Sequence, residues 1–332
     1  MRFAWALVVS VSISVSCAAS PPVRVGEPAA DDGWVTASSA RRPTPASAPS
    51  TTPPVQPLPL EGCGDTQEGF DGWLESFRRH AVTEGLSAQT VARALTDVTY
   101  DPEVIELDRS QAAFKLSFAE LSARRITRAR VARGTELLRS HAELFAKIEQ
   151  RFGVAPQILA AIWGLETDFG ENVGSRSCLR ALATLAYDCR RKARFRGELA
   201  SALRIVERGD LAPAEMVGAW AGELGQTQFL PSSYERFAID FDGDGRVDLI
   251  RSSADALAST ARYLQSHGWR RDEGYGAGSA NFEVLRAWNA SEVYRQVIVA
   301  FAAKLPGARR SDARASERDA PGGRSGSASG VE

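Results

Sequence analysis

The sequence predicts a mainly α-helical domain, and three observations lead to that fold class. From Phe70 onward, apolar residues recur at steps of three and four, which is the spacing of one face of a helix. Strand-like alternation of apolar and polar residues is scarce. Gly and Pro stand at the ends of the periodic segments, where helices end and begin. We therefore expect helices almost throughout the middle of the chain, with one loop-rich insert around residues 218–250.

The helical repeat is clearest in four segments. They are FDGWLESFRRHAVTEG (70–85), SAQTVARALTDV (87–98), TRARVARGTELLRSHAELFAKIEQRFG (127–153) and FRGELASALRIVERGD (195–210). A further helix is expected to begin at Pro156, because proline is favoured at the first helical position, and to run into AIWGLETDFG (161–170). Another, ADALASTARYLQSHGW (254–269), follows an acidic loop. These segments fall within about 240 residues, which is enough to bury a sizeable core.

The N-terminus has the pattern of an export signal. In residues 1–16, Arg2 is followed by an apolar run that is too short to span a bilayer. Cys17 follows at once, so the stretch resembles a bacterial lipoprotein signal, with Cys17 as the lipidated residue. This predicts a periplasmic protein that is anchored to the outer membrane only through its lipid. A plain secretory signal with an incidental cysteine is the alternative.

The remaining composition sets the domain limits. Residues 17–67 are expected to form a linker, because ten of the sixteen prolines lie in residues 21–60 among Ala, Ser and Thr. Residues 307–332 are low in apolar side chains and are expected to be a disordered tail. The folded domain is therefore expected to span residues 68–306. The net charge is −1 with both signs interspersed, which does not indicate a nucleic-acid partner.

The candidate catalytic groups reduce to carboxylates. The histidines His80, His141 and His267 are scattered and no GxSxG motif accompanies them, which disfavours a Ser–His–Asp hydrolase. The chain has no CxxC or HExxH zinc pattern and no glycine motif for phosphates or dinucleotides. Acid–base chemistry is left to Asp and Glu side chains.

Glu166 is the most unusual of these carboxylates. A helix numbered through AIWGLETDFG places Glu166 on the same face as Leu159, Ile162 and Phe169. A carboxylate on an apolar face must either be paired or have its pKa raised until it is neutral. Pairing with an arginine such as Arg180 would make Glu166 structural, whereas a neutral carboxyl would be a general acid. The residues alone leave both interpretations open.

Five segments together resemble the lytic murein transglycosylase B family, over about residues 68–306. They are AIWGLETDFG (161–170), RALATLAYDCRR (180–191), WAGELGQTQFLPSSY (220–234), DFDGDGRVDLI (240–250) and VLRAWNASEVY (284–294). The resemblance implies a lysozyme-like catalytic domain with additional helices. It also implies that the substrate is peptidoglycan, and it makes proteins of peptidoglycan synthesis candidate partners.

By this resemblance, Glu166 is the catalytic acid/base. It would protonate the oxygen between N-acetylmuramic acid and N-acetylglucosamine, then deprotonate the C6 hydroxyl that attacks C1. The product would be a 1,6-anhydro sugar, and no water would be consumed. Asp168 is expected to point to the opposite helical face, because two helical steps rotate it by about 200°. A single acid is therefore expected, in contrast to the usual pair of glycosidase carboxylates.

The resemblance also implies a set of substrate-binding residues: Gln228, Trp288, Asn289 and Tyr187. Two positions depart from the family pattern, Ala219 in place of a common serine and Glu223 in place of a small residue. Two other functions remain as alternatives. One is a hydrolytic, lysozyme-type muramidase that uses the same Glu166, and the other is a non-catalytic, calcium-dependent lipoprotein that binds the cell wall.

The acidic loop is expected to hold a structural Ca²⁺ ion. Four aspartates lie at positions one, three, five and nine of an EF-hand-type loop: Asp240, Asp242, Asp244 and Asp248. Gly245 occupies position six, and the carbonyl of Arg246 would bind at position seven. Position twelve is Arg251 rather than glutamate, so we expect Asp255 to supply the remaining ligand. An Asp/Gly turn without an ion is the alternative.

The exported cysteines are expected to form one disulfide. Cys178 and Cys189 are close in sequence, but LRALATLAYD between them reads as continuous helix. That helix would hold their α-carbons about 16 Å apart, whereas a disulfide needs roughly 4.4–6.8 Å. Cys63 lies on the approach to the domain and can reach either end of that helix. We therefore expect Cys63–Cys189 first, Cys63–Cys178 second and no disulfide third.

Overall fold

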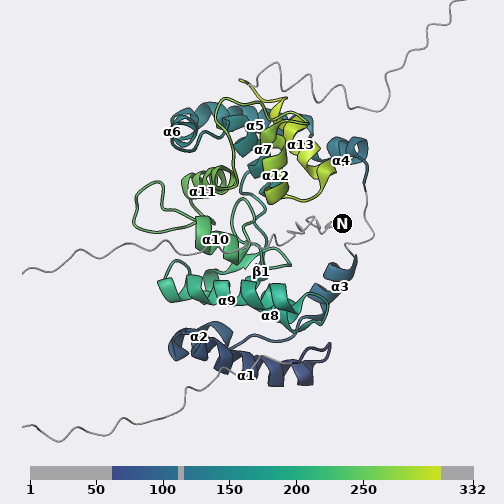
Figure 1. Cartoon of the computed structure of the whole chain (residues 1–332), viewed down its shortest axis with the longest axis vertical. Helices are drawn as coiled ribbons and strands as arrows, with labels where there is room; N and C mark the ends of the chain where they lie inside the picture. Colours follow the sequence, from purple (N-terminus) through teal and green to yellow (C-terminus); the bar gives the residue numbers. More distant parts are fainter. Residues whose placement is uncertain (1–61, 111–115, 308–332) are drawn as a thin grey trace, which may run out of the picture. The chain divides into compact units, whose positions relative to one another are not determined.

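A computed structural model describes residues 62–110 and 116–307 (Figure 1). The expected signal peptide, the lipidation site Cys17, almost all of the expected linker and the tail beyond residue 307 lie outside these described residues. Within the described residues, no helix combines the length and the apolar character that crossing a membrane requires.

The described residues are mainly α-helical, as predicted, and their helices bury two hydrophobic clusters. The first cluster draws on α1 (Gln67–Thr83), α2 (Ala88–Leu95), α3 (Pro102–Ser110), α8 (Cys178–Tyr187), α9 (Lys192–Arg208) and α10 (Pro231–Phe237). The second draws on α6 (Ala142–Phe152), α7 (Pro156–Thr167), α11 (Ser253–Ser266), α12 (Ala280–Trp288) and α13 (Glu292–Ala302), and α4 (Phe118–Arg125) and α5 (Arg128–Ser140) pack against it. In Figure 1, α1 and α2 lie beside α8 and α9, which they contact.

The segment 127–153, expected as one helix, is two helices. The chain leaves helical geometry at His141, whose φ of −109° and ψ of 27° end α5 and precede α6. The break gives the two helices different partners, because α5 packs against α7 whereas α6 packs against both α7 and α11. No Gly or Pro marks this break, so the sequence pattern did not reveal it.

Helix α7 lies among α5, α6, α11 and α13 and is buried from Ile158 to Thr167. It begins with Pro156 at its first position, as the sequence predicted. It ends at Thr167, because Asp168 and Phe169 adopt left-handed backbone conformations with φ of 55° and 61°. The expectation that Asp168 points to the opposite helical face is therefore wrong, since Asp168 no longer belongs to the helix.

The strands form one short antiparallel sheet at the edge of the loop-rich insert. Strand β1 (Arg176–Ser177) pairs with β2 (Val217–Gly218), and isolated bridges join Gly218 to Leu224 and Leu224 to Phe229. A short 3₁₀ helix, Pro213–Glu215, precedes β2. This pairing fixes the segment after α7 against the glutamine-bearing loop at 220–230.

A disulfide joins Cys63 to Cys189, and their α-carbons lie 5.0 Å apart. This is the pairing that the sequence analysis placed first. Helix α8 runs unbroken from Cys178 to Tyr187, so Cys178 is held away from Cys189 and remains a buried thiol. Beside the disulfide, Arg109 of α3 pairs with Asp188 at 2.9 Å. The start of the domain is thus attached to the turn between α8 and α9.

Candidate active site

Glu166 lies in the last turn of α7, at a cavity of about 560 Å³. The walls come from α3, the ends of α4 and α7, the start of α5, and the segments around β1 and β2. Gln228 lines the same cavity, so the structure brings together two of the predicted site residues that are 62 positions apart in the sequence numbering. Asp168 also lines this cavity, but it pairs with Arg130 at 3.0 Å.

The two oxygens of the Glu166 carboxyl have different surroundings. The side chain is only 8% exposed. Oε1 accepts one hydrogen bond from the Trp288 indole nitrogen at 3.1 Å and another from the Tyr294 hydroxyl at 2.9 Å. Oε2 is buried and accepts none from the described residues. Because both donors point at Oε1, the proton of the neutral carboxyl belongs on Oε2.

Burial raises the pKa of the Glu166 carboxyl above its ordinary value, because desolvation penalises the charged form. The hydrogen bonds from Trp288 and Tyr294, and the positive charge of Arg125, act in the opposite direction. Arg180, the arginine considered as a structural partner, donates instead to the carbonyls of Thr99 and Tyr100 at 3.2 and 3.0 Å. No ion pair joins Glu166 to another residue in the described part of the chain, so the pairing with an arginine that the sequence left open is not observed.

A second buried carboxyl, Glu223, lies in the loop that follows β2. It is 5% exposed, and its Oε2 accepts a hydrogen bond from the backbone nitrogen of Ala221 at 3.2 Å. Burial is the largest cause that raises the pKa of Glu223 to about 7, and the charge of Glu166 adds to the rise. The sequence marked Glu223 only as a departure from the family pattern and gave it no role.

Gln228 holds the two walls of the cavity together. Its backbone is left-handed, with φ of 57°. Its amide nitrogen donates to the carbonyls of Val173 and Gly225 at 3.1 and 2.8 Å. The amide oxygen is therefore the Gln228 atom that can accept a hydrogen bond from a ligand. Gln226, which the sequence reasoning passed over, is buried and accepts from the Trp163 indole at 2.9 Å, which ties the loop to α7.

Trp288 and Asn289 lie at the end of α12, outside the cavity lining. The half-buried Trp288 ring packs edge-on against Phe229 and Tyr263, with centroids 5.6 and 5.4 Å away, while its nitrogen reaches Glu166. Asn289 is 4% exposed, and its Oδ1 accepts from the backbone nitrogen of Ser291 at 2.9 Å. Trp288 thus orients the acid, and Asn289 supports the turn into α13.

The position of Tyr187 differs from its predicted role as a substrate-binding residue. It is 5% exposed and packs with Phe70, Trp73 and Tyr100, whose ring centroids lie 5.7, 5.7 and 6.1 Å away. These contacts place Tyr187 in the first hydrophobic cluster, under α1, and not among the residues that line the cavity. The expected contact of Tyr187 with substrate is therefore wrong, because the ring is used to attach α1 to α8.

Tyr294 is the site residue that sequence reasoning missed. It is 3% exposed, in the first turn of α13, and its hydroxyl donates to Glu166. A buried tyrosine hydroxyl needs a hydrogen-bond partner. The sequence did offer a signal for this role, because Tyr294 is the last residue of VLRAWNASEVY, one of the five segments that carry the family resemblance.

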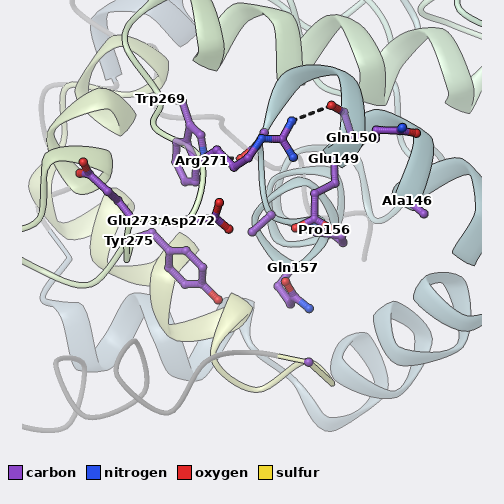
Figure 2. A pocket seen from close by; sticks show the side chains of 13 residues that line it. Ala146, Glu149, Gln150, Pro156, Gln157, Trp269, Arg271, Asp272, Glu273 and Tyr275 are labelled. Carbon is purple, nitrogen blue, oxygen red and sulfur yellow. Dashed lines mark hydrogen bonds between the residues drawn. The ribbon is translucent and has the colours of Figure 1, made fainter.

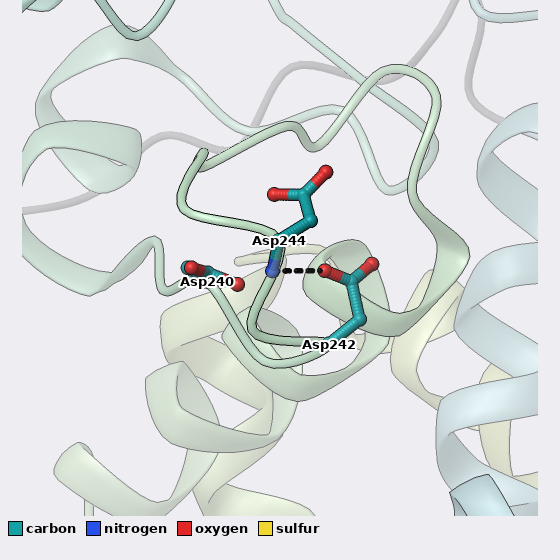
Figure 3. A group of neighbouring side chains, drawn as sticks. All are labelled: Asp240, Asp242 and Asp244. Carbon is teal, nitrogen blue, oxygen red and sulfur yellow. Dashed lines mark hydrogen bonds between the residues drawn. The ribbon is translucent and has the colours of Figure 1, made fainter.

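In the acidic loop, three of the expected metal ligands converge. Asp240, Asp242 and Asp244 each offer an oxygen, and these oxygens lie within 4.8 Å of one another (Figure 3). Gly243 and Gly245 have φ of 79° and 87°, so the loop has the sharp turn that an EF-hand-type loop needs at its sixth position. Asp240 also accepts from the backbone nitrogens of these two glycines, at 2.7 and 2.9 Å.

Two of the other expected ligands, Asp248 and Asp255, have other partners, whereas the carbonyl of Arg246 remains a predicted ligand. Asp255 accepts from the backbone nitrogens of Phe241 and Asp248 at 2.7 and 2.9 Å, so it closes the loop through hydrogen bonds. Asp248 pairs with Arg251 at 2.6 Å. Arg246 donates its backbone nitrogen to Asp244 at 2.8 Å. The donor set that fits a cation is therefore Asp240, Asp242 and Asp244, and the expected contributions of Asp248 and Asp255 are corrected.

A second cavity, of about 490 Å³, lies between α6, the start of α7 and residues 269–275 (Figure 2). Glu149, Asp272 and Glu273 contribute carboxylates to it, and Arg271 donates to the carbonyl of Gln150 at 2.6 Å. None of the predicted site residues lines this cavity.

Comparisons with known proteins agree with this picture. Residues 69–279 match the family described as Transglycosylase SLT domain. Membrane-bound lytic murein transglycosylase B of Escherichia coli (strain K12) is 37% identical over 145 residues, which are 43% of this chain and 40% of that relative. This chain therefore spans less than half the length of that curated relative.

Solved structures share the fold. SltB3 of Pseudomonas aeruginosa, in complex with NAG-NAM-pentapeptide, matches with a TM-score of 0.68 and 31% identity over 72% of this chain and 80% of that chain. Escherichia coli lytic transglycosylase Slt35, in complex with calcium, matches with a TM-score of 0.63 and 24% identity over 75% of this chain and 97% of that chain. The predicted fold class, mainly α with additional helices, is confirmed.

Proposed function

We propose that this chain, which belongs to the Transglycosylase SLT domain family, is a lytic murein transglycosylase that cleaves peptidoglycan glycan strands. One observation carries the proposal: Glu166 is buried at a cavity, has no ion-pair partner among the described residues, and keeps Oε2 clear of the two donors that hold Oε1. Burial raises the pKa of this carboxyl, as a general acid requires.

The reaction proceeds in two proton transfers at Glu166. The acid first protonates the glycosidic oxygen between N-acetylmuramic acid and N-acetylglucosamine, and the bond from C1 to that oxygen breaks. The substrate's own N-acetyl oxygen stabilises the positive charge at C1. The Glu166 carboxylate then takes the proton of the C6 hydroxyl while the C6 oxygen bonds to C1. The acid is regenerated, a 1,6-anhydro end forms, and no water is consumed.

The surrounding side chains favour this single-acid route. Asp168 lines the same cavity, but its carboxylate is paired with Arg130 at 3.0 Å. A retaining glycosidase would need a second, free carboxylate as nucleophile beside the acid, and the substrate's N-acetyl group replaces it here. The amide oxygen of Gln228 is proposed to accept a hydrogen bond from a sugar hydroxyl or amide. The exposed part of the Trp288 ring is proposed to stack on a sugar face.

The test is the chemistry of the cleaved ends. Purified protein is incubated with peptidoglycan sacculi, and the released muropeptides are weighed by mass spectrometry. Products with 1,6-anhydro ends support the transglycosylase. Reducing ends, heavier by one water, would show a hydrolytic muramidase, and intact sacculi would show a wall-binding protein without catalysis. Glu166→Gln serves as the inactive control in each arm.

We further propose that the acidic loop holds one Ca²⁺ ion. Three carboxylates at positions one, three and five, with glycine at six, suit a hard cation that prefers oxygen ligands. Arg251 stands where an EF-hand loop places a bidentate glutamate, so we expect modest affinity. The ion would stabilise the loop beside Ile250, whose carbonyl accepts from Gln226 at 3.1 Å.

For its location, we propose that the protein is exported to the periplasm and anchored by lipid on Cys17, with peptidoglycan as its partner. The support is the sequence of the first seventeen residues and the membrane-bound relative. Radiolabelled palmitate should be incorporated in the cell, and Cys17→Ser should move the protein to the soluble periplasmic fraction. Unlabelled protein in the membrane fraction would contradict the anchor.

A further inference from the structure

We propose that Arg125 is a positioning residue for Glu166 that acts through the hydroxyl of Tyr294, an inference that rests on the proposed catalytic role of Glu166. Arg125 is the last residue of α4 and lines the cavity together with Glu166. The sequence pattern gave it no role.

The hydrogen bonds among the three side chains have a fixed direction. Tyr294 donates to Oε1 of Glu166 at 2.9 Å, and the Arg125 side chain is hydrogen-bonded to Tyr294. A hydroxyl has one proton, and a guanidinium can only donate. Arg125 therefore donates to the Tyr294 oxygen, and that oxygen gives its proton to the contact with Glu166. If the Tyr294 hydroxyl rotated away from Glu166, its proton would point at the positively charged guanidinium of Arg125. Arg125 therefore favours the orientation in which Tyr294 donates to Glu166.

The fold places Arg125 at this point through two attachments. Helix α4 packs against α13, the helix that carries Tyr294. The carbonyl oxygen of Arg125 also accepts a hydrogen bond from Arg130 at 2.6 Å, and Arg130 pairs with Asp168 at 3.0 Å, directly after α7. The end of α4 is thus tied to the end of α7. Because this link uses the backbone of Arg125, a change of its side chain leaves the link in place.

The charges around Glu166 make the position of Arg125 chemically useful. Ionisable groups that interact with Glu166 include Arg125 from α4, Tyr294 from α13 and Glu223 from the loop after β2, and Arg130 pairs with Asp168 at the helix end. Glu103, Glu171 and Arg176 also line the cavity. The positive charge of Arg125 lowers the pKa of Glu166 against the effect of burial. After Glu166 gives up its proton, the same cation stabilises the buried carboxylate until it takes the C6 proton.

The main comparison is Arg125→Gln with Arg124→Gln, a change at the exposed neighbour in the same helix. Arg125→Gln should lower kcat roughly 10- to 100-fold, the size expected for one charge-assisted hydrogen bond, with little change in KM. In a plot of kcat against pH, the alkaline limb should move to higher pH, because the pKa of Glu166 rises when the charge of Arg125 is removed. Arg125→Lys should restore part of kcat, and Arg124→Gln should behave as the wild type. A merely structural role would not move the pH limb.

Further variants test the route through Tyr294. Tyr294→Phe should reproduce the loss, and the double variant Arg125→Gln/Tyr294→Phe should be no slower than the slower single variant. If the losses of kcat in the two single variants add up in the double variant, Arg125 does not act through Tyr294. A raised KM at unchanged kcat would show that Arg125 binds substrate instead.

A titration without substrate separates this inference from the proposed function. The ¹³C signal of the Glu166 carboxyl, identified by its loss in Glu166→Gln, should titrate at higher pH in Arg125→Gln than in Arg124→Gln. An unchanged titration would overturn the inference even if the protein cleaves peptidoglycan. A shifted titration in a protein that releases no anhydro ends would overturn the proposed function alone.

Discussion

The indole nitrogen of Trp288 donates a hydrogen bond to Oε1 of Glu166 over 3.1 Å, although the two residues are 122 positions apart in the chain. Phe229 and Tyr263 pack edge-on against the same ring, so the indole is held in place by its neighbours. The orientation of the acid is therefore set by the end of α12, far from α7 in sequence.

Trp288→Phe keeps most of the packing and removes the indole donor. We expect kcat to fall roughly tenfold or more, because the carboxyl loses one of the two bonds that fix its proton on Oε2. The matched control is Trp269→Phe, whose nitrogen donates to the carbonyl of Gly153 at 3.1 Å. That change should lower the melting temperature and leave kcat near wild type. Equal kcat losses in both variants would show that Trp288 matters only for packing.

Glu166→Gln should abolish glycan cleavage, because the amide cannot act as an acid. Losing a general acid typically costs 10²–10⁴-fold in rate. The melting temperature should not fall, since a buried carboxyl whose pKa is raised by desolvation is replaced by an uncharged group of the same shape. Asp168→Asn is the comparison for a two-carboxyl mechanism. It should cost far less activity, and a loss as large as that of Glu166→Gln would contradict the single-acid route.

Glu223 should make stability depend on pH. Its folded pKa of about 7 lies above the ordinary value of 4.5, so its contribution is fully present below pH 4.5 and is lost as the pH rises through 7. The loss approaches about 3 kcal/mol. Glu223→Gln keeps an acceptor for Ala221 and should abolish this fall, so urea unfolding should show a gain over wild type at pH 8 and little difference at pH 4. The exposed Glu171→Gln should show no such pH-dependent gain.

Removing the disulfide should destabilise the start of the domain. The bridge closes a loop of 126 positions, for which the chain-entropy model gives about 5 kcal/mol. The double variant Cys63→Ser/Cys189→Ser should therefore melt at a lower temperature than wild type. Cys178→Ala leaves the bridge intact and serves as the control. Non-reducing peptide mapping that links Cys178 to another cysteine would contradict the pairing.

Calcium should raise the melting temperature, and the acidic loop should be responsible. Asp242→Asn and Asp244→Asn should reduce or remove the calcium-dependent rise, because their carboxylates belong to the converging set. Asp255→Asn, in the first turn of α11 directly after the loop, is a matched comparison. It weakens the hydrogen bonds to Phe241 and Asp248, so it should lower the melting temperature about equally with and without calcium. If millimolar Ca²⁺ leaves the wild-type melting temperature unchanged, the loop holds no ion.

The sequence by itself determined the features that depend on local pattern. Helical periodicity gave the fold class, and proline at position 156 gave the start of α7. Glu166 stood out in the sequence because it is a carboxylic acid on an apolar helical face, and the structure shows that it is buried. The spacing of Cys178 and Cys189 along one helix was enough to disfavour their pairing.

Tertiary structure decided everything that depends on which distant segments meet. Tyr187 was expected at the substrate, but its ring is buried against α1, a contact that no local pattern encodes. Asp168 left its helical face because the chain turns left-handed directly after Thr167. The donors to Glu166 come from α12 and α13, far from α7 in the chain. Periodicity predicts which side of an element is buried, but the partner on that side depends on the packing of helices far apart in the chain.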